Sequence, residues 1–124
     1  MKVRRPLVSI VDDDESVRES LPDLLREFGF RAEAFSSAEQ FLRSGVINET
    51  ECLVLDISMP GMTGPDLERE LARRGKPIPI IYITAQRDEI ARPDLLKKGA
   101  VECLLKPFSD TALQKALYLA FTRD

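Results

Sequence analysis

Four short apolar runs divide the chain, and each leads into polar residues at its end. The runs cover residues 7–11, 52–55, 80–83 and 101–105. Because they are short and rich in Val, Ile and Leu, we expect them to be strands of a parallel sheet with both faces covered. Residues 30–35 are expected to add one further, short strand. The hydrophobic pattern therefore predicts five strands.

Helical repeats alternate with these strands. Ser16 with Glu19 and Ser36 with Glu39 have the spacing of capping boxes, which predicts that the first two helices begin there. Pro65 suits the first turn of a third helix, where its missing N–H has no helical partner. Five strands and five helices in strict alternation predict an α/β fold. We expect a single doubly wound, flavodoxin-like parallel sheet with strand order 2-1-3-4-5 and five flanking helices.

Length and composition narrow the class of protein. The chain has 124 residues, which fits one domain over residues 1–124. Hydrophobic residues make up 44% of it, as in a globular protein. The net charge of −3 argues against direct binding of nucleic acid, which uses a basic surface. No run approaches the ~20 apolar residues of a membrane span, and the N-terminus does not have the pattern of a signal peptide.

The cysteines and the absence of histidine add two constraints. Cys52 and Cys103 lie in predicted strands that would flank a third, which places them roughly 10 Å apart. A disulfide needs Cα atoms within about 7 Å, so we expect free thiols, a reducing compartment and a cytoplasmic location. The sequence contains no histidine, so it has no histidine base, metal ligand or phosphohistidine of its own.

Three aspartates mark the ends of two strands. Asp12 and Asp13 follow the first strand, and Asp56 closes the third. Each has an ordinary explanation alone, as an acidic helix start or as the start of a turn. In a doubly wound sheet, however, these strands are neighbours, so the three carboxylates would meet. Two carboxylates about 5 Å apart repel by roughly 3 kcal/mol at an effective dielectric constant near 20, and a bound cation would remove that cost. Hard oxygen ligands favour Mg²⁺ over zinc.

Two further polar residues end the remaining strands. Thr84 follows the fourth strand and Lys106 follows the fifth. A hydroxyl donor and an ammonium beside a metal are what a phosphoryl group in transfer needs, because its charge spreads over three oxygens. We also expect a cis peptide bond between Lys106 and Pro107, since the lysine must turn back over the site and an X–Pro bond makes the cis form accessible.

These residues carry a resemblance to a known family. In their order and spacing they resemble the receiver domain of two-component response regulators, over essentially the whole chain. The matching stretches are residues 11–14, 55–64, 83–85 and 106–108. Residues 17–21, 37–42 and 98–101 are most similar to the FixJ-type branch of this family. In that branch the receiver usually precedes a helix-turn-helix DNA-binding domain.

The resemblance implies a role for each site residue. Asp56 would be the phosphoacceptor. Asp13 would bind Mg²⁺ directly and Asp12 would help through water, while Asp56 and the backbone carbonyl of Ser58 would supply the other protein ligands. Lys106 would pair with the phosphoryl oxygens. No organic cofactor is implied, and the domain would not be an enzyme beyond its own phosphotransfer and autodephosphorylation.

The resemblance also implies a switch, for which this chain departs from the family in two places. Thr84 would hydrogen-bond the phosphoryl group and move with it, but Cys103 occupies the position of the usual aromatic residue. Pro93 falls inside the fourth helical repeat and disfavours helix before it. We therefore expect that helix to begin near Arg92 or Pro93. Residues 86–91 would form a mobile loop, and the switch would be loop ordering rather than ring rotation.

The implied partners are a sensor histidine kinase and a C-terminal or separate output domain with a transcriptional, DNA-binding role. Phosphorylation would act on the face of the fourth helix, fifth strand and fifth helix, and a homodimer formed on phosphorylation is compatible with it. One alternative is a small Mg²⁺-dependent phosphohydrolase with an aspartyl-phosphate intermediate, although no second acid lies two residues after Asp56. Another is a flavin-binding module, although the acidic cluster would repel a phosphate and no Gly-rich loop is present.

Overall fold

The computed structural model describes residues 4–122, so both ends of the predicted domain, residues 1–3 and 123–124, lie outside the described residues. Five parallel strands form one sheet in the order β2-β1-β3-β4-β5, which confirms the predicted fold class and strand order. The strands are β1 (Leu7–Val11), β2 (Arg31–Phe35), β3 (Thr50–Asp56), β4 (Ile80–Thr84) and β5 (Glu102–Leu105). The helices are α1 (Glu15–Glu27), α2 (Ala38–Arg43), α3 (Gly64–Arg73), the 3₁₀ helix η1 (Gln86–Ala91), α4 (Arg92–Lys97) and α5 (Asp110–Thr122).

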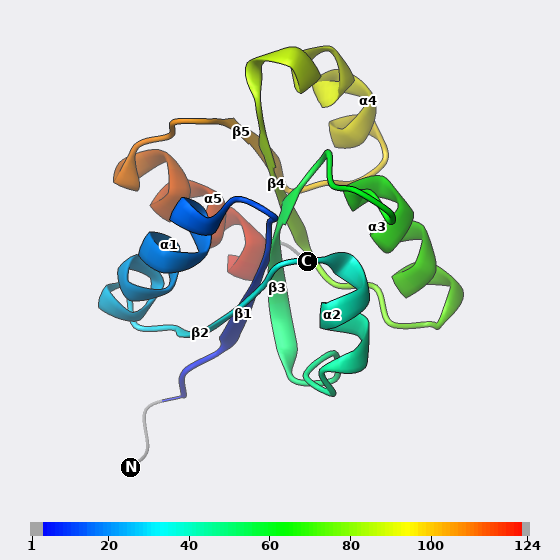
Figure 1. The fold of residues 1–124 in the computed structure, drawn as a ribbon. Coiled ribbons are helices and arrows are strands. Elements are labelled where there is room, and N and C mark those ends of the chain that lie inside the picture. Colours follow the sequence, from blue (N-terminus) through cyan, green and yellow to red (C-terminus); the bar gives the residue numbers. More distant parts are fainter. Residues whose placement is uncertain (1–3, 123–124) are drawn as a thin grey trace.

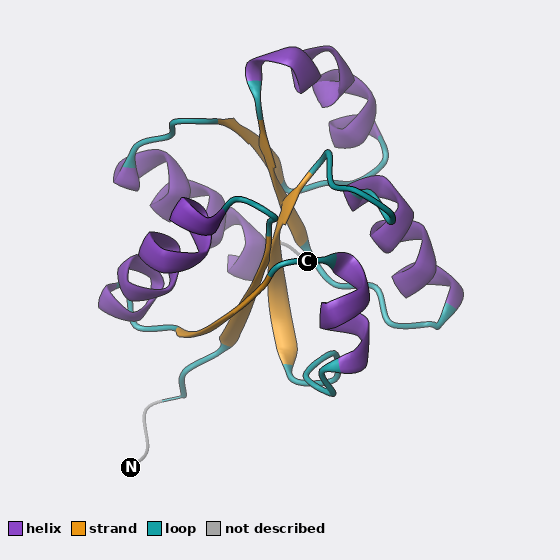
Figure 2. Cartoon of the chain, in the orientation of Figure 1, coloured by secondary structure: helices purple, strands orange, loops and turns teal. Residues whose placement is uncertain are grey.

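Helices cover both faces of the sheet. Helices α1 and α5 lie on one face, and α2, α3 and α4 lie on the other (Figures 1 and 2). Side chains alternate between the two cores along each central strand. On β3, Leu53 and Leu55 belong to the core beneath α2–α4, whereas Cys52 and Val54 belong to the core beneath α1 and α5. All residues of β1 and β4 are buried, which explains why these strands are almost entirely apolar.

The first two helices begin at different caps from those predicted. The N-cap of α1 is Asp14, whose carboxylate accepts a hydrogen bond from the backbone N–H of Ser16 (2.9 Å). The N-cap of α2 is Ser37, whose hydroxyl accepts from the N–H of Gln40 (3.0 Å). Both capping boxes expected from the sequence are therefore wrong, because a neighbouring residue with extended backbone already satisfies the free N–H groups of the first turn.

The segment after β4 differs in part from its prediction. Helix α4 begins at Arg92 with Pro93 in its first turn, as expected. Residues 86–91, however, form the 3₁₀ helix η1 rather than an irregular loop. The N–H of Arg92 donates to the carbonyl of Glu89, which is the short 3₁₀ spacing, and Pro93 has no N–H with which to continue an α-helical ladder. A proline at this position therefore separates two helical segments.

Both cysteines are free, as expected. They lie on β3 and β5, on either side of β4, and in different cores. Burial raises the pKa of Cys52 to about 12 and the pKa of Cys103 to about 11, so both are neutral thiols near pH 7. No helix in the described part of the chain is long and apolar enough to span a membrane.

The loop after β3 folds back tightly on the end of that strand. The N–H of Gly64, the first residue of α3, donates to the carbonyl of Ile57 (2.9 Å). A Cβ atom at Gly64 would lie 2.4 Å from the carbonyl oxygen of Asp56 and 3.0 Å from the ring of Tyr82. Only glycine therefore lets α3 begin against the strand end that carries Asp56.

We predict that Gly64→Ala lowers the free energy of unfolding by about 1–3 kcal/mol through this backbone overlap. Urea titration measures the loss. Gly75→Ala is the control, because Gly75 has a positive φ of 71° but open space around its Cα. Its cost should be only that of the left-handed backbone, roughly 1 kcal/mol. A smaller loss in Gly64→Ala than in Gly75→Ala would contradict the proposed overlap.

Candidate acidic site at the carboxyl edge of the sheet

Four strands deliver the predicted site residues to one edge. Asp12 and Asp13 follow β1, and Asp56 is the last residue of β3, which pairs in parallel with β1. Thr84 ends β4, and Lys106 follows β5. The parallel strands all finish on the same side, so five side chains from distant parts of the sequence come together. All five lie at or just after the strand ends where the sequence pattern puts them.

The three carboxylates crowd together. One oxygen from each of Asp12, Asp13 and Asp56 lies within 4.8 Å of the others. Asp12 is fully buried and Asp56 is 5% exposed, whereas Asp13 faces solvent. Lys106 balances part of this charge, with its Nζ 2.8 Å from Oδ2 of Asp12 and 4.0 Å from Oδ2 of Asp56. The lysine is therefore closer to Asp12 than to the expected phosphoacceptor.

Hydrogen bonds to β2, to α1 and to the next turn fix Asp12. Its N–H donates to the carbonyl of Phe35 at the end of β2 (3.1 Å), and its own Oδ1 accepts from the N–H of Asp14 (2.9 Å). The guanidinium of Arg18 on α1 donates to its carbonyl oxygen (3.0 Å). These bonds hold a buried carboxylate at the base of the site in one orientation.

The crowding of charges and their burial shift the pKa values of Asp56 and Lys106. Burial and the neighbouring charge of Asp12 raise the pKa of Asp56 to about 7, although Lys106 opposes the shift. For Lys106, burial lowers the pKa, but the hydrogen bond and charge of Asp12 and the charge of Asp56 outweigh it, so the pKa lies above its ordinary value. Lys106 is therefore a permanent cation, and Asp56 is the acid that bears the unbalanced repulsion.

The carboxylates fit a divalent metal by their chemistry. They are hard oxygen donors from three residues, two of which are buried, and the single lysine leaves a net negative charge among them. Mg²⁺ is held in proteins by a few carboxylates while it keeps several waters. Asp12, Asp13 and Asp56 could supply such ligands. The contribution of the backbone carbonyl of Ser58, two residues after Asp56, stays a prediction.

Two acids that the sequence interpretation missed approach the site from η1. The hydroxyl of Thr84 donates to Oε2 of Glu89 (3.3 Å), and the hydroxyl of Ser58 donates to Oδ1 of Asp88 (3.0 Å). Thr84 therefore makes a hydrogen bond to an acid of the following segment. No periodic signal indicates these contacts, because Asp88 and Glu89 lie in a segment without a regular hydrophobic pattern.

The predicted switch positions lie beside the site on β5 and α4. Cys103 is the register partner of Tyr82 on β4, and both belong to the core beneath α2–α4. Tyr82 is fully buried, and its hydroxyl donates to Glu68 of α3 (2.6 Å). This face thus carries an aromatic ring on β4 instead of β5, fixed by a hydrogen bond. Arg92, next to Pro93, donates to the carbonyl of Cys103 (3.3 Å) and ties α4 to β5.

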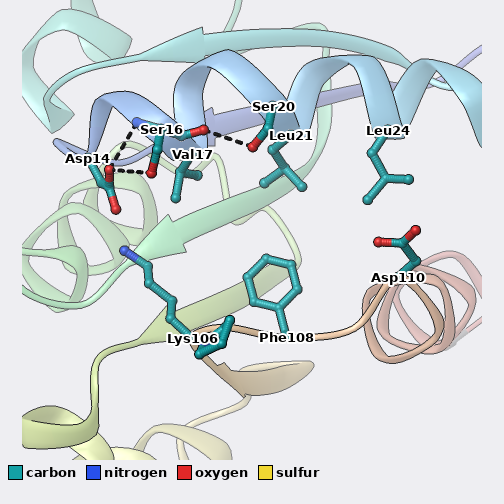
Figure 3. Close-up of a pocket in the computed structure, with 10 residues that line it drawn as sticks. Asp14, Ser16, Val17, Ser20, Leu21, Leu24, Lys106, Phe108 and Asp110 are labelled. Atoms are coloured by element: carbon teal, nitrogen blue, oxygen red, sulfur yellow. Dashed lines mark hydrogen bonds between the residues drawn. The ribbon is translucent and has the colours of Figure 1, made fainter.

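A cavity of about 590 Å³ opens beside the site between α1 and the connection from β5 to α5 (Figure 3). The side chain of Lys106 extends along this cavity toward Asp14, and Phe108 points from the connection toward α1. The peptide bond between Lys106 and Pro107 is cis, which confirms the prediction. Lys106 thus contacts the carboxylates with its amino group and also lines an accessible cavity.

Comparisons with known proteins agree with this geometry. The family model of the response regulator receiver domain matches residues 8–118. Nodulation protein W of Bradyrhizobium diazoefficiens is 43% identical over 120 residues, which cover 97% of this chain and 53% of that protein. Transcriptional regulatory protein FixJ of Azorhizobium caulinodans is 38% identical over 117 residues, or 94% of this chain and 56% of that protein. The chain thus spans about half the length of these curated relatives.

Solved structures give the same result. The response regulator StyR has a TM-score of 0.85 at 44% identity, and the match covers 94% of this chain and 59% of that chain. The structure of FixJ-N has a TM-score of 0.82 at 38% identity, and the match covers 95% and 94% of the two chains. Sequence similarity and backbone similarity therefore extend over the same region.

The crowded carboxylates predict an unusual pH dependence of stability. Because the folded protein holds the proton of Asp56 up to about pH 7 and the unfolded chain releases it near 3.8, stability should fall as the pH rises between these values. Above about pH 7 the penalty is complete. We predict that Asp56→Asn raises the free energy of unfolding by roughly 1–3 kcal/mol at pH 8 with a chelator present. The gain should vanish near pH 4.

Urea unfolding of both proteins at pH 4, 6 and 8 measures this difference. Asp23→Asn is the matched control, since Asp23 is an exposed acid paired with Arg26 on α1, and its removal should change stability little at any pH. A wild-type protein that is more stable than Asp56→Asn at pH 8 in the absence of metal would show that Asp56 does not bear repulsion.

Proposed function

The chain belongs to the family of response regulator receiver domains of two-component systems, and we propose that it accepts a phosphoryl group on Asp56. The observation that carries this proposal is the position of Asp56, a buried carboxylate that closes a strand among two other carboxylates and faces the one lysine of the site. A buried acid in this position has no packing role, and the ammonium of Lys106 beside it can neutralise charge on a phosphoryl group that it accepts.

In the proposed reaction, a carboxylate oxygen of Asp56 attacks the phosphorus of a phosphohistidine on a partner sensor kinase. The phosphorus–nitrogen bond breaks, its electron pair stays on the imidazole, and an acyl phosphate forms on Asp56. The 124 residues contain no histidine, so the donor histidine lies outside this sequence. The attacking oxygen must be ionised, so the balance of charge around Asp56 sets the fraction of protein ready to react.

We propose that Asp12, Asp13 and Asp56, with the carbonyl of Ser58, hold a Mg²⁺ ion. When bound, the ion neutralises charge on the phosphoryl oxygens and lowers the repulsion among the carboxylates. The fit rests on the spacing and hardness of the three carboxylates. The phosphohydrolase alternative is not favoured, because the family match covers most of the chain and its relatives are regulators.

Lys106 and Thr84 complete the proposed site. The ammonium of Lys106 already lies between two carboxylates and would shift toward the phosphoryl oxygens, where it would stabilise charge throughout transfer. The hydroxyl of Thr84, at the end of the adjacent strand, would donate to one of those oxygens. Both residues position and neutralise the group, and neither forms a covalent bond to it.

The proposed partners follow from the relatives. Because this chain matches only about half of each curated relative, an output domain attached to or separate from this receiver would carry the response. One relative is named a transcriptional regulatory protein, which supports a transcriptional output. The cytoplasmic location, the lack of direct nucleic-acid contact by this domain and a dimer formed on phosphorylation stay predictions.

We expect acetyl phosphate with Mg²⁺ to add one phosphoryl group to the protein, as read by intact mass. Asp56→Asn should carry no adduct, because an amide is not a nucleophile of this kind. Asp23→Asn on the outer surface of α1 should carry the same adduct as the wild type. A phosphoryl adduct that persists in Asp56→Asn would refute the assignment.

Mg²⁺ should stabilise the fold by mass action. For a dissociation constant on the order of 1 mM, 10 mM Mg²⁺ adds roughly 1.4 kcal/mol, or about 5 °C in melting temperature. Asp13→Ala should lose this gain, whereas Glu15→Ala, which removes an exposed acid on the first turn of α1, should keep it. Equal stabilisation of Asp13→Ala and wild type by Mg²⁺ would place the metal elsewhere.

A further inference from the structure

Segment η1 is fastened to the edge of the site by two hydroxyl–carboxylate hydrogen bonds. Both donors flank Asp56, with Thr84 at the end of the neighbouring strand and Ser58 two residues further along the chain. Both acceptors, Glu89 and Asp88, belong to η1. The hydroxyl of Thr84 is thus occupied by an acid of η1 at the place where the proposed function needs it for a phosphoryl oxygen.

Apart from Ala91, which is partly buried against the core beneath α2–α4, little else holds η1 in place. None of its six residues is buried, and Ile90 is 91% exposed. One carboxylate oxygen of Asp88 is buried without a hydrogen-bond partner among the described residues, and the Nε of Arg87 lies 3.9 Å from it. A segment with few buried apolar groups and an under-satisfied carboxylate lies at the low end of local stability. Its position therefore depends on the polar contacts to Thr84 and Ser58.

The next segment is held more firmly. Arg92, the first residue of α4, donates to Oε1 of Glu102 (3.0 Å) and to the carbonyl of Cys103 (3.3 Å), both on β5. Leu95 of α4 is buried in the core beneath α2–α4. The boundary between a loosely held and a firmly held segment therefore falls at Arg92.

We propose that Glu89, with Asp88, is an autoinhibitory latch that holds η1 against the site, and that a phosphoryl group on Asp56 opens the latch by taking the hydroxyl of Thr84. This inference rests on the proposed function. The contacts of the latch are hydrogen bonds, so opening breaks no covalent bond. It exchanges one hydrogen-bond acceptor of Thr84, the Glu89 carboxylate, for another, a phosphoryl oxygen.

Two forces favour this exchange in the same direction. The hydroxyl of Thr84 has one hydrogen to donate, so it cannot serve Glu89 and a phosphoryl oxygen equally. A phosphoryl group also carries about −1.5 to −2 charges at pH 7, more than the single charge of the Asp56 carboxylate that it replaces, and it would lie close to Glu89, a carboxylate that has no cation of its own in the described structure. The phosphorylated site thus interacts less favourably with closed η1 than with open η1, which is the differential free energy that a switch requires.

The latch changes the expected form of the switch. The sequence predicts ordering of a mobile loop at residues 86–91, but η1 is already a 3₁₀ helix with both of its acids engaged. In the proposed switch, Thr84 exchanges its hydrogen-bond acceptor and η1 is released from the site, so the segment is freed and not ordered. Cys103 is too small to report movement of Thr84 by a ring swing, and Tyr82 is fixed by Glu68. The movement therefore lies between Ala85 and Arg92.

Beryllofluoride with Mg²⁺, which mimics a phosphoryl group on a carboxylate, provides the first test by calorimetric titration. Glu89→Ala should bind it roughly 3- to 10-fold more tightly than wild type, the range for one hydrogen bond that no longer competes. In a Thr84→Ala background, where no hydroxyl is left to hold, Glu89→Ala should give no further gain. An unchanged affinity in Glu89→Ala, or an equal gain in both backgrounds, would overturn the latch.

Asp94→Ala is the matched control. It removes one carboxylate from the start of α4, where Asp94 pairs with Lys98 and not with a hydroxyl of the site. Its affinity for beryllofluoride should stay within about twofold of wild type. A gain as large as that of Glu89→Ala would attribute the effect to general charge and overturn the inference.

A second measurement tests the latch without any phosphoryl mimic. In the free protein, amide hydrogen exchange of Asp88 and its neighbours in η1 should be faster in Glu89→Ala and in Ser58→Ala than in wild type, while α4 keeps its protection. Unchanged exchange in η1 would overturn the latch even if beryllofluoride binds. Conversely, beryllofluoride binding that survives in Asp56→Asn would refute the phosphoacceptor assignment and leave the exchange result to decide the latch.

Discussion

Crowding of three carboxylates around a single lysine is the constraint on which the site depends. Asp12, Asp13 and Asp56 lie within 4.8 Å of one another, and the one ammonium beside them is nearer to Asp12. Burial and the remaining negative charge raise the pKa of Asp56, and the negative charge makes a bound cation favourable there. Repulsion among the carboxylates destabilises this edge of the folded protein, and the relief of that repulsion favours binding of a cation.

The rest of the molecule keeps these charges in place. Strands β1 and β4 are buried throughout, so their ends cannot shift without exposing the cores beneath the helices. Gly64 lets α3 begin against the carbonyl of Asp56, and the backbone bond to Phe35 fixes the start of the acidic loop. By contrast, η1 has no buried residue. Rigid support below the site and a loosely held segment beside it suit a domain that must switch without losing its acceptor geometry.

The sheet, its strand order and the acidic edge could be predicted from the sequence, because each depends on short apolar runs and on the rule that parallel strands end together. The start of α4 could also be predicted from the local sequence, because Pro93 disfavours helix in the residues before it. The predicted caps of α1 and α2, Ser16 and Ser36, were wrong because Asp14 and Ser37 lie nearby and can cap equally well, and only the backbone path decides between them. The contacts of Tyr82 with Glu68 and of Thr84 with Glu89 depend on packing between separate elements, for which one sequence has no local signal.

Proton release on Mg²⁺ binding tests the carboxylate crowding most directly. Metal binding displaces protons from ligands that are protonated in the free protein. With the pKa of Asp56 near 7, calorimetric titration of Mg²⁺ at about pH 6 should show an enthalpy that depends on the ionisation enthalpy of the buffer, corresponding to release of a fraction of a proton. At pH 9 the dependence should disappear. Mg²⁺ binding at pH 6 without any dependence on the buffer would contradict a crowded, partly protonated site.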